Sequence, residues 1–278
     1  MKLVRKTLIA ALFLAFTASG FQPAVGQEGH KISINETEIY YEVRGDGPPL
    51  LLLHYFGNCG QAWQPFVERL AQHYRLIIPD MRGHGRSTNP SGQFTHRQSA
   101  LDMFALLDKL GIKRFKAMGM SSGGMTLIHM ATQQPERIED LVLIGATIYF
   151  SAPARATFRR SVPDSMTAAE LKEWGQCSSR GEAQTHEVLA QFHRMKESYD
   201  DMNFTEPYLA TITARTLIVH GDHDEIFPVD IPFQMYRAIP RSYLWIVPNG
   251  GHIPIFGKSA EIFLDKALAF LQGKWEKS

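Results

Sequence analysis

Two adjacent serines among glycines, in Gly119-Met120-Ser121-Ser122-Gly123, are the residues of this sequence best suited to nucleophilic chemistry. The stretch follows an apolar run and precedes a helical pattern, which is the context of a sharp strand-to-helix turn that presents a serine. Small residues two positions before and two after that serine let the backbone turn tightly, and Gly119 and Gly123 occupy those positions. The spacing therefore predicts Ser121 as the nucleophile.

A serine hydroxyl needs a base near neutral pH, and the base needs a third group to orient it. Asp222 and Asp224 lie in a Gly-Asp-x-Asp turn after one apolar run, and His252 lies in a glycine-rich loop after the last one. Each candidate follows the end of a predicted strand, in the chain order Ser, Asp, His. This order differs from those of the chymotrypsin and subtilisin types.

Alternating strand and helix patterns must position these residues. Continuous apolar runs predict strands covered on both faces, as in a parallel sheet, at 50–54, 74–80, 114–120, 141–146, 216–221 and 243–248. Two further strands, 31–34 and 38–45, are expected to pair in antiparallel fashion. Helical patterns occur at 65–72, 99–110, 125–134 and 258–271. The chain is therefore predicted to be an α/β protein with a mostly parallel eight-stranded sheet and helices on both faces.

One interval, residues 147–213, has no strand pattern. It is far too long for an ordinary connection, so it should carry structure of its own. Short helices are expected at 167–175, 180–195 and 197–204. We therefore expect a small helical cap over one end of the sheet, with residues 27–146 and 214–278 forming the core.

The motifs together resemble the α/β-hydrolase superfamily, over nearly all of the chain after residue 26. The matching segments are LLLHYFG, PDMRGHGRS, GMSSGG, QQPERIEDLVLIGA, GDHDEIFP and GGHIPIF. The resemblance implies that Ser121 is the nucleophile, His252 the base and Asp224 the acid, because the family's acid is usually the second Asp of Gly-Asp-x-Asp-x-x-x-Pro. Asp222 is then expected to accept backbone N–H groups within its turn.

The resemblance also implies an oxyanion hole. One donor is expected to be the backbone N–H of Ser122, the residue after the nucleophile, which leaves the Ser122 hydroxyl dispensable. The other is expected to be the N–H of Phe56, in His54-Tyr55-Phe56-Gly57. Tyr55 stands where similar proteins usually have glycine. Its side chain either packs outward or directs its phenol at the acyl oxygen as an additional donor.

A serine nucleophile predicts an acyl-enzyme, with a small-molecule carboxylic ester as the default substrate. A lactonase, a perhydrolase or a carbon–carbon bond hydrolase would use the same triad, and a non-catalytic binding protein of this fold is the alternative from another class. No cofactor or metal site is expected. The residues expected to line the substrate pocket are Tyr55, Met120, Phe150, Trp174, Phe192, Phe227 and Ile253, with Phe158, Met195, Tyr199 and Phe204 as further candidates.

The charge balance argues against a nucleic-acid partner. Twenty-nine Lys and Arg against 28 Asp and Glu give a net charge of +1, without the basic excess that nucleic-acid binders show. The sequence makes no prediction of the oligomeric state.

The first 26 residues have the pattern of a secretory signal peptide. A basic start is followed by a short apolar run and by the small residues of Ala24-Val25-Gly26. The apolar run is too short to span a membrane, although an uncleaved anchor is an alternative. We therefore expect an exported protein, periplasmic or secreted, with no membrane span after cleavage. Export would permit a disulfide between Cys59 and Cys177, but the sequence does not decide whether they meet.

Overall fold

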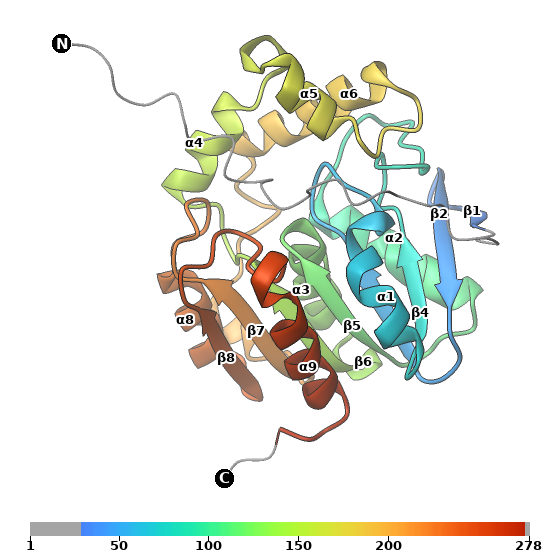
Figure 1. The fold of residues 1–278 in the computed structure, drawn as a ribbon, viewed down its shortest axis with the longest axis vertical. Coiled ribbons are helices and arrows are strands. Elements are labelled where there is room, and N and C mark those ends of the chain that lie inside the picture. Colours follow the sequence, from blue (N-terminus) through green and yellow to red (C-terminus); the bar gives the residue numbers. More distant parts are fainter. Residues whose placement is uncertain (1–28, 276–278) are drawn as a thin grey trace.

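A twisted sheet forms the centre of the molecule in the computed structural model, which describes residues 29–275 (Figure 1). The predicted signal peptide, residues 1–26, lies outside the described residues. Strand order is β1-β2-β4-β3-β5-β6-β7-β8, with β2 antiparallel to both of its neighbours and the other pairs parallel. This confirms the predicted eight-stranded, mostly parallel sheet. The strands are β1 (His30–Ile34), β2 (Thr37–Arg44), β3 (Pro49–Leu53), β4 (Arg75–Pro79), β5 (Phe115–Met120), β6 (Ile138–Ile144), β7 (Arg215–Gly221) and β8 (Ser242–Val247).

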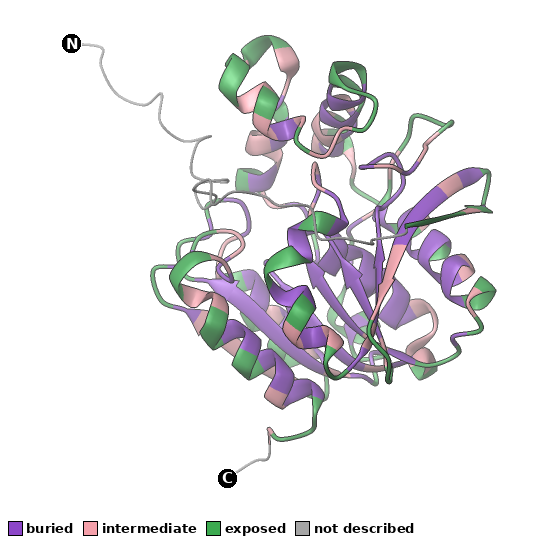
Figure 2. Ribbon diagram, turned by 45° about the vertical axis from the view of Figure 1, so that its right-hand side comes forward, coloured by how far each residue is buried: buried purple, intermediate pink, exposed green. Residues whose placement is uncertain are grey.

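Successive side chains of the strands enter two separate apolar cores, one on each face of the sheet. In β3, Leu50 and Leu52 pack with α1 (Gln64–Ala71) and α9 (Ala260–Leu271). Leu51 and Leu53 pack on the other face, against α2 (His96–Lys109), α3 (Ser122–Gln133) and α8 (Asp230–Ala238). Because both faces are covered, the central strands β3 to β7 are largely apolar and buried along most of their length (Figure 2).

Three helices of the core differ from the sequence-based expectations, and one of them, α3, begins at Ser122, three residues before the predicted start. Helix α2 begins at His96, three residues before the predicted start, because Thr95 caps it by accepting a hydrogen bond from the backbone N–H of Gln98. Helix α8, Asp230–Ala238, was not predicted at all. Its apolar residues Ile231 and Met235 are spaced four apart and enter the same core as α2 and α3.

Residues 147–213, called the cap segment below, form a layer above the sheet (Figure 1). The prediction of a helix at 197–204 is wrong. That stretch contains bends and an isolated bridge instead, because its residues pair with the other end of the cap segment: Asn203 pairs with Tyr149, and the N–H of Phe204 donates to the carbonyl of Ile148 at 3.1 Å. The two ends of the segment are thereby joined. Its helices are α4 (Ala152–Arg160), α5 (Ala168–Trp174), α6 (Glu182–Arg194) and α7 (Glu206–Leu209).

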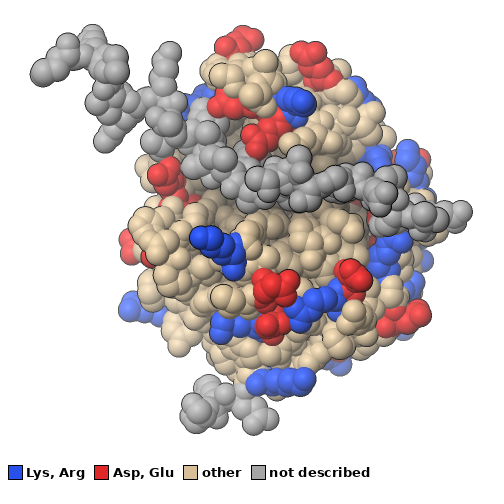
Figure 3. All heavy atoms as spheres, viewed as in Figure 1, with Lys and Arg blue, Asp and Glu red and all other residues tan. Residues whose placement is uncertain are grey.

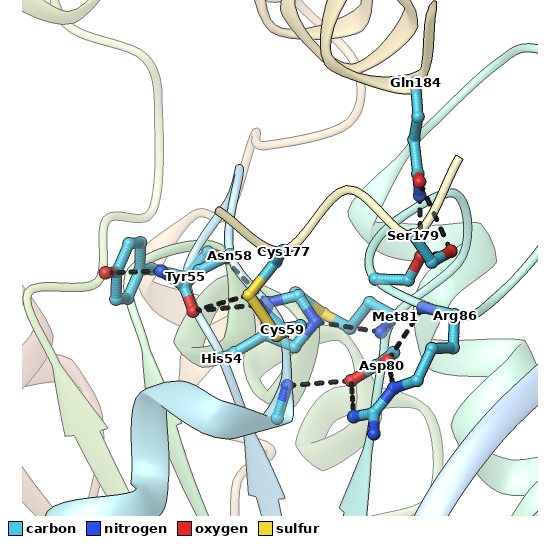
Figure 4. Close-up of a disulfide and its surroundings, with 12 residues drawn as sticks. His54, Tyr55, Asn58, Cys59, Asp80, Met81, Arg86, Cys177, Ser179 and Gln184 are labelled. Atoms are coloured by element: carbon cyan, nitrogen blue, oxygen red, sulfur yellow. Dashed lines mark hydrogen bonds and ion pairs between the residues drawn. A yellow bond between two sulfur atoms is a disulfide. The ribbon is translucent and has the colours of Figure 1, made fainter. Parts of the chain in front are cut away.

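A disulfide joins the cap segment to the loop that follows β3 (Figure 4). Cys59, at the end of that loop, bonds to Cys177, just beyond α5, with their Cα atoms 5.8 Å apart. The question that the sequence left open is therefore answered: the two cysteines meet. Nearby, Gln184 Nε2 donates to the carbonyl of Gly85 at 2.8 Å, a second link between cap and core.

The surface carries no concentration of one sign of charge on the face seen in Figure 3, where acidic and basic side chains are interspersed. Within residues 29–275, no helix has the length and apolar character needed to cross a membrane.

Candidate active site

Ser121 lies alone in the turn between β5 and α3, in a strained backbone conformation. Its φ of 47° and ψ of −112° are outside the regions that non-glycine residues usually adopt. Two backbone hydrogen bonds hold it there: its N–H donates to the carbonyl of Ile144 at 2.7 Å, and its own carbonyl accepts from the N–H of Met125 at 2.9 Å. Strain retained at one residue by the surrounding structure is typical of functional sites.

The glycines on either side make this turn possible. A Cβ at Gly119 would lie 2.6 Å from the backbone of Gly123, and a Cβ at Gly123 would lie 2.4 Å from the carbonyl oxygen of Leu53. Real Cβ atoms do not approach backbone so closely, so both positions exclude any larger residue. This is the physical basis of the Gly-x-Ser-x-Gly pattern in this chain.

The structure brings Ser121, His252 and Asp224 into one chain of hydrogen bonds. The Ser121 hydroxyl lies 2.8 Å from His252 Nε2, and His252 Nδ1 lies 2.8 Å from Asp224 Oδ2. The Asp224 side chain is fully buried, and the His252 side chain is 8 % exposed. With Asp224 ionised, Nδ1–H donates to the carboxylate, and the Nε2 lone pair accepts the Ser121 proton.

Asp224 remains a carboxylate although it is buried. Burial by itself raises its pKa, but the neighbouring His252 and hydrogen bonds to the carboxylate outweigh burial and hold the pKa below its ordinary value. Asp224 Oδ1 accepts the backbone N–H groups of Ile226 and Phe227, at 2.8 and 2.9 Å. Asp222 is turned away and accepts the N–H of Gly250 at 3.1 Å, so the structure places the second Asp of the turn at the imidazole.

The two expected oxyanion donors lie beside this chain. Among the described residues, no acceptor takes the backbone N–H of Phe56 or of Ser122, the first residue of α3. His54 braces the Phe56 loop: its Nδ1–H donates to the carbonyl of Tyr55 at 2.8 Å, and its Nε2 accepts the N–H of Met81 at 2.9 Å. A backbone N–H without an acceptor, beside a serine hydroxyl, is suited to hold developing negative charge.

Comparison with known proteins identifies the family to which the chain belongs. A family model described as "alpha/beta hydrolase fold" matches residues 48–169. An uncharacterized protein of Mycobacterium tuberculosis is 34 % identical over an alignment that covers 83 % of this chain and 77 % of that protein. The chain belongs to the α/β-hydrolase family.

Two characterised proteins show what this hydrolase is similar to. A pimeloyl-[acyl-carrier protein] methyl ester esterase of Vibrio vulnificus is 26 % identical, with 84 % of this chain and 98 % of that protein aligned. The solved structure of a thermophilic esterase from Thermogutta terrifontis matches with a TM-score of 0.72 at 24 % identity, covering 88 % of this chain and 98 % of that one. The second match shows the fold alone.

The hydrolase has a narrow cavity of about 30 Å³ at Ser121. Four of the predicted pocket residues, Tyr55, Trp174, Phe192 and Phe227, line it, as do the further candidates Phe158 and Met195. Sequence reasoning missed Met125 and Ile226. Both lie near residues already identified, four positions after Ser121 and two after Asp224, and that closeness in the sequence was the available signal. The full lining is Tyr55, Phe56, Ser121, Ser122, Met125, Phe158, Trp174, Phe192, Met195, Ile226, Phe227 and His252.

Three predicted pocket residues, Met120, Phe150 and Ile253, do not line the cavity of the hydrolase. Met120 is fully buried on the face of the sheet covered by α1 and α9, because side chains alternate along β5. Phe150 packs edge-on against Phe158, with ring centroids 5.0 Å apart, and is one layer behind the lining. Ile253 packs against the same core as Met120.

The Tyr55 phenol contacts its own loop. Asn58 Nδ2 donates to the Tyr55 hydroxyl at 2.7 Å, and Asn58 Oδ1 accepts the N–H of Cys59 at 2.9 Å (Figure 4). Burial raises the pKa of Tyr55 to about 12, so the phenol stays neutral. Tyr55 therefore both lines the cavity and closes the loop that carries Phe56.

Sequence reasoning also missed two residues that are linked to the site's second serine, one directly and one through the other. The Ser122 hydroxyl, expected to be dispensable, lies 2.7 Å from His96 Nε2, and His96 Nδ1 lies 2.6 Å from Asp201 Oδ2. The chain separation between His96 and Asp201 is 105 residues, and no local pattern connects them.

Proposed function

We propose that this α/β hydrolase is a serine hydrolase that cleaves carboxylic esters through an acyl-enzyme. The observation that carries the proposal is the hydrogen-bonded chain from Ser121 through His252 to the buried carboxylate of Asp224. A serine and histidine oriented by a buried carboxylate form the arrangement that generates a serine nucleophile near neutral pH.

The residues would act in two matched steps. In the first, Ser121 Oγ attacks the ester carbonyl carbon while His252 Nε2 takes the hydroxyl proton, and the carbonyl oxygen becomes an oxyanion held by the N–H groups of Phe56 and Ser122. Collapse of this intermediate breaks the bond to the leaving alkoxide, which receives the proton from His252. In the second, water replaces the serine as nucleophile, releases the acid and restores Ser121.

The cavity supports a substrate whose reacting end is apolar. Its polar groups are the two serines, the imidazole and the Tyr55 phenol, and no Asp, Glu, Lys or Arg lines it in the described part of the chain. Arg155, on helix α4 of the cap segment, donates to the carbonyl oxygens of Lys196 and Ser198 at 2.6 and 2.8 Å. This arginine therefore supports the cap structure.

The size of the cavity supports movement of the cap segment during substrate entry. A volume of about 30 Å³ holds roughly two water molecules. Trp174, Phe192 and Met195, all from the cap segment, form much of its wall. Side chains of these residues must shift for any ester larger than a short acyl group to reach Ser121.

A panel of p-nitrophenyl esters of increasing acyl length, with lactones included, tests the proposal. Wild-type protein is expected to release p-nitrophenol, and Ser121→Ala is expected to reduce kcat by about 10⁵- to 10⁶-fold. Arg194→Ala is a matched control, because it removes only a contact to the carbonyl of Gly92 on the surface. Turnover by Ser121→Ala at the wild-type rate would refute the proposal, and ligand binding without turnover in either protein would favour a binding protein.

We also propose that the protein is exported. The Cys59–Cys177 disulfide supports this, since such bonds persist in oxidising compartments. Mass spectrometry of the mature protein from a native host is expected to begin near residue 27. An intact N-terminus on protein recovered from the cytoplasm would contradict the proposal.

A further inference from the structure

A second chain of serine, histidine and aspartate lies beside the first. Its members are Ser122, His96 and Asp201, with contacts of 2.7 Å between Ser122 Oγ and His96 Nε2 and 2.6 Å between His96 Nδ1 and Asp201 Oδ2. The His96 side chain is fully buried, Ser122 is 1 % exposed, and the Asp201 side chain is 7 % exposed. The order of atoms repeats that of Ser121, His252 and Asp224.

The start of α2 fixes the direction of the protons in this chain. Asp201 accepts the backbone N–H groups of His96 and Arg97 at 2.9 and 3.1 Å, the first two of the helix. Burial alone would raise the pKa of Asp201, but His96 and these N–H groups lower it to about 2, so the group is a carboxylate. His96 Nδ1–H therefore donates to Asp201, and in the tautomer that carries its proton on Nδ1 the other ring nitrogen, Nε2, accepts the hydroxyl hydrogen of Ser122.

This second chain connects three separate parts of the molecule. Asp201 belongs to the cap segment, two residues before the Asn203 bridge that joins its ends. His96 is the first residue of α2, and Ser122 is the first residue of α3. The backbone N–H of Ser122 is one of the two donors of the proposed oxyanion hole. A residue of the cap segment is thus linked, through one imidazole, to a residue that would contact the reacting carbonyl.

We infer that Asp201 and His96 are positioning residues for the oxyanion hole, holding Ser122 so that its backbone N–H points at the reacting oxygen. The inference rests on the proposed serine-hydrolase function. The first N–H groups of a helix have no acceptor within the helix, so their direction depends on how the first residue is held. The His96 contact fixes the side-chain rotamer of Ser122 and directs its hydroxyl hydrogen away from the oxyanion.

A purely structural role for the same contacts makes a different prediction. If Asp201 and His96 only attach the cap segment to α2, weakening them lowers stability or substrate affinity and leaves the chemical step intact. If they position the Ser122 N–H, weakening them lowers kcat, because an oxyanion donor acts in the transition state. The ratio of the effects on kcat and KM separates the two roles.

Ser122→Ala and Asp201→Asn test the inference with p-nitrophenyl esters. Ser122→Ala removes the hydroxyl and leaves a residue suited to a helix start. Asp201→Asn keeps the shape but favours the other His96 tautomer, whose Nε2–H would donate to Ser122 and turn its hydroxyl around. Each variant is expected to lower kcat about tenfold and to keep KM within about twofold of wild type. This decrease in kcat is smaller than the roughly 10²- to 10³-fold decrease that follows removal of an oxyanion donor. The double variant is expected to be no worse than either single variant.

Arg194→Ala, which breaks a cap-to-core contact remote from Ser122, is the control and is expected to keep wild-type kcat. A Ser122→Ala kcat within twofold of wild type would overturn the inference. A double variant whose kcat falls by the product of the two single-variant decreases would also overturn it. Failure of the proposed function is distinguished by Ser121→Ala, which would then retain turnover.

Proton NMR gives a readout independent of activity. The inference predicts two low-field imidazole N–H signals, of which Asp201→Asn removes one and Asp224→Asn the other. A single signal in the wild-type protein, lost only in Asp224→Asn, would overturn it.

Discussion

Removing the Cys59–Cys177 disulfide is expected to destabilise the protein substantially. The bond joins residues separated by 118 positions and ties the cap segment to the loop that carries Phe56. A cross-link that closes so long a loop restricts the unfolded chain far more than the folded one. Ala is the appropriate replacement at Cys59, because this position is 3 % exposed and a serine there would bury a hydroxyl.

The chain-entropy relation for a loop of this length gives a limit of about 5 kcal/mol at 25 °C, and measured losses are typically about 2–4 kcal/mol. At roughly 2–4 °C per kcal/mol for a chain of this size, a loss of about 3 kcal/mol lowers Tm by about 6–12 °C. The cap segment also keeps other attachments, among them Gln184 to Gly85 and Asp201 to His96, so it is expected to stay folded in the variant.

Guanidinium unfolding of wild type and of Cys59→Ala/Cys177→Ala, each with and without reductant, measures this loss. Reductant should destabilise the wild type and have no effect on the double variant. A loss below about 1 kcal/mol would refute the reasoning, since it would mean that the loop is already constrained in the unfolded state. Two separate transitions in the variant would refute it in another way, by showing that the cap segment unfolds independently.

Three further outcomes are expected. Asp224→Asn should lower kcat by about 10⁴-fold with little change in KM, measured by steady-state kinetics. The reason is that Asn cannot hold His252 in the tautomer whose Nε2 accepts a proton from Ser121. Burial lowers the pKa of His84 to about 3 and of His129 to about 4. Below pH 6.5 the unfolded chain therefore binds protons at these two histidines that the folded chain does not bind. Stability present above pH 6.5 should therefore be lost as the pH falls, by about 3 kcal/mol per histidine at pH 4, measured by urea unfolding across pH. Tyr55→Phe should cost about 1 kcal/mol through the lost contact to Asn58 and leave kcat/KM within twofold; a larger fall in kcat/KM would make the phenol an additional oxyanion donor.

The sheet and the hydrogen-bonded residues Ser121, Asp224 and His252 could be predicted because their signals are local. A strand covered on both faces must be apolar along its whole length, so β3 and β5 are visible as runs of letters. Ser121 and Asp224 stand in short motifs whose glycines and spacing have steric causes, such as the 2.4 Å approach that excludes a Cβ at Gly123. Met120 was misplaced although the period of two along β5 contained the answer, since it shares a face with Met118.

The cap segment could not be predicted in the same way because its contacts are long-range. Asp201 was assigned to a helix on local composition, whereas its conformation is decided by His96, 105 residues earlier in the chain. The same reason hid the partner of the Ser122 hydroxyl and the layer in which Phe150 lies. A buried histidine with no local motif gives no indication of which carboxylate it will meet.

The cap segment is attached to the core at both proposed oxyanion donors. On one side the disulfide holds the loop of Phe56, and the ring of Phe192 in the cap packs against the ring of Phe56, with ring centroids 5.2 Å apart. On the other, Asp201 holds Ser122 through His96. A substrate that forces the cap outward would therefore disturb the groups proposed to stabilise the transition state. Esters with long or branched acyl groups should consequently lose kcat as well as affinity, whereas a cap that only selects substrates would change KM alone.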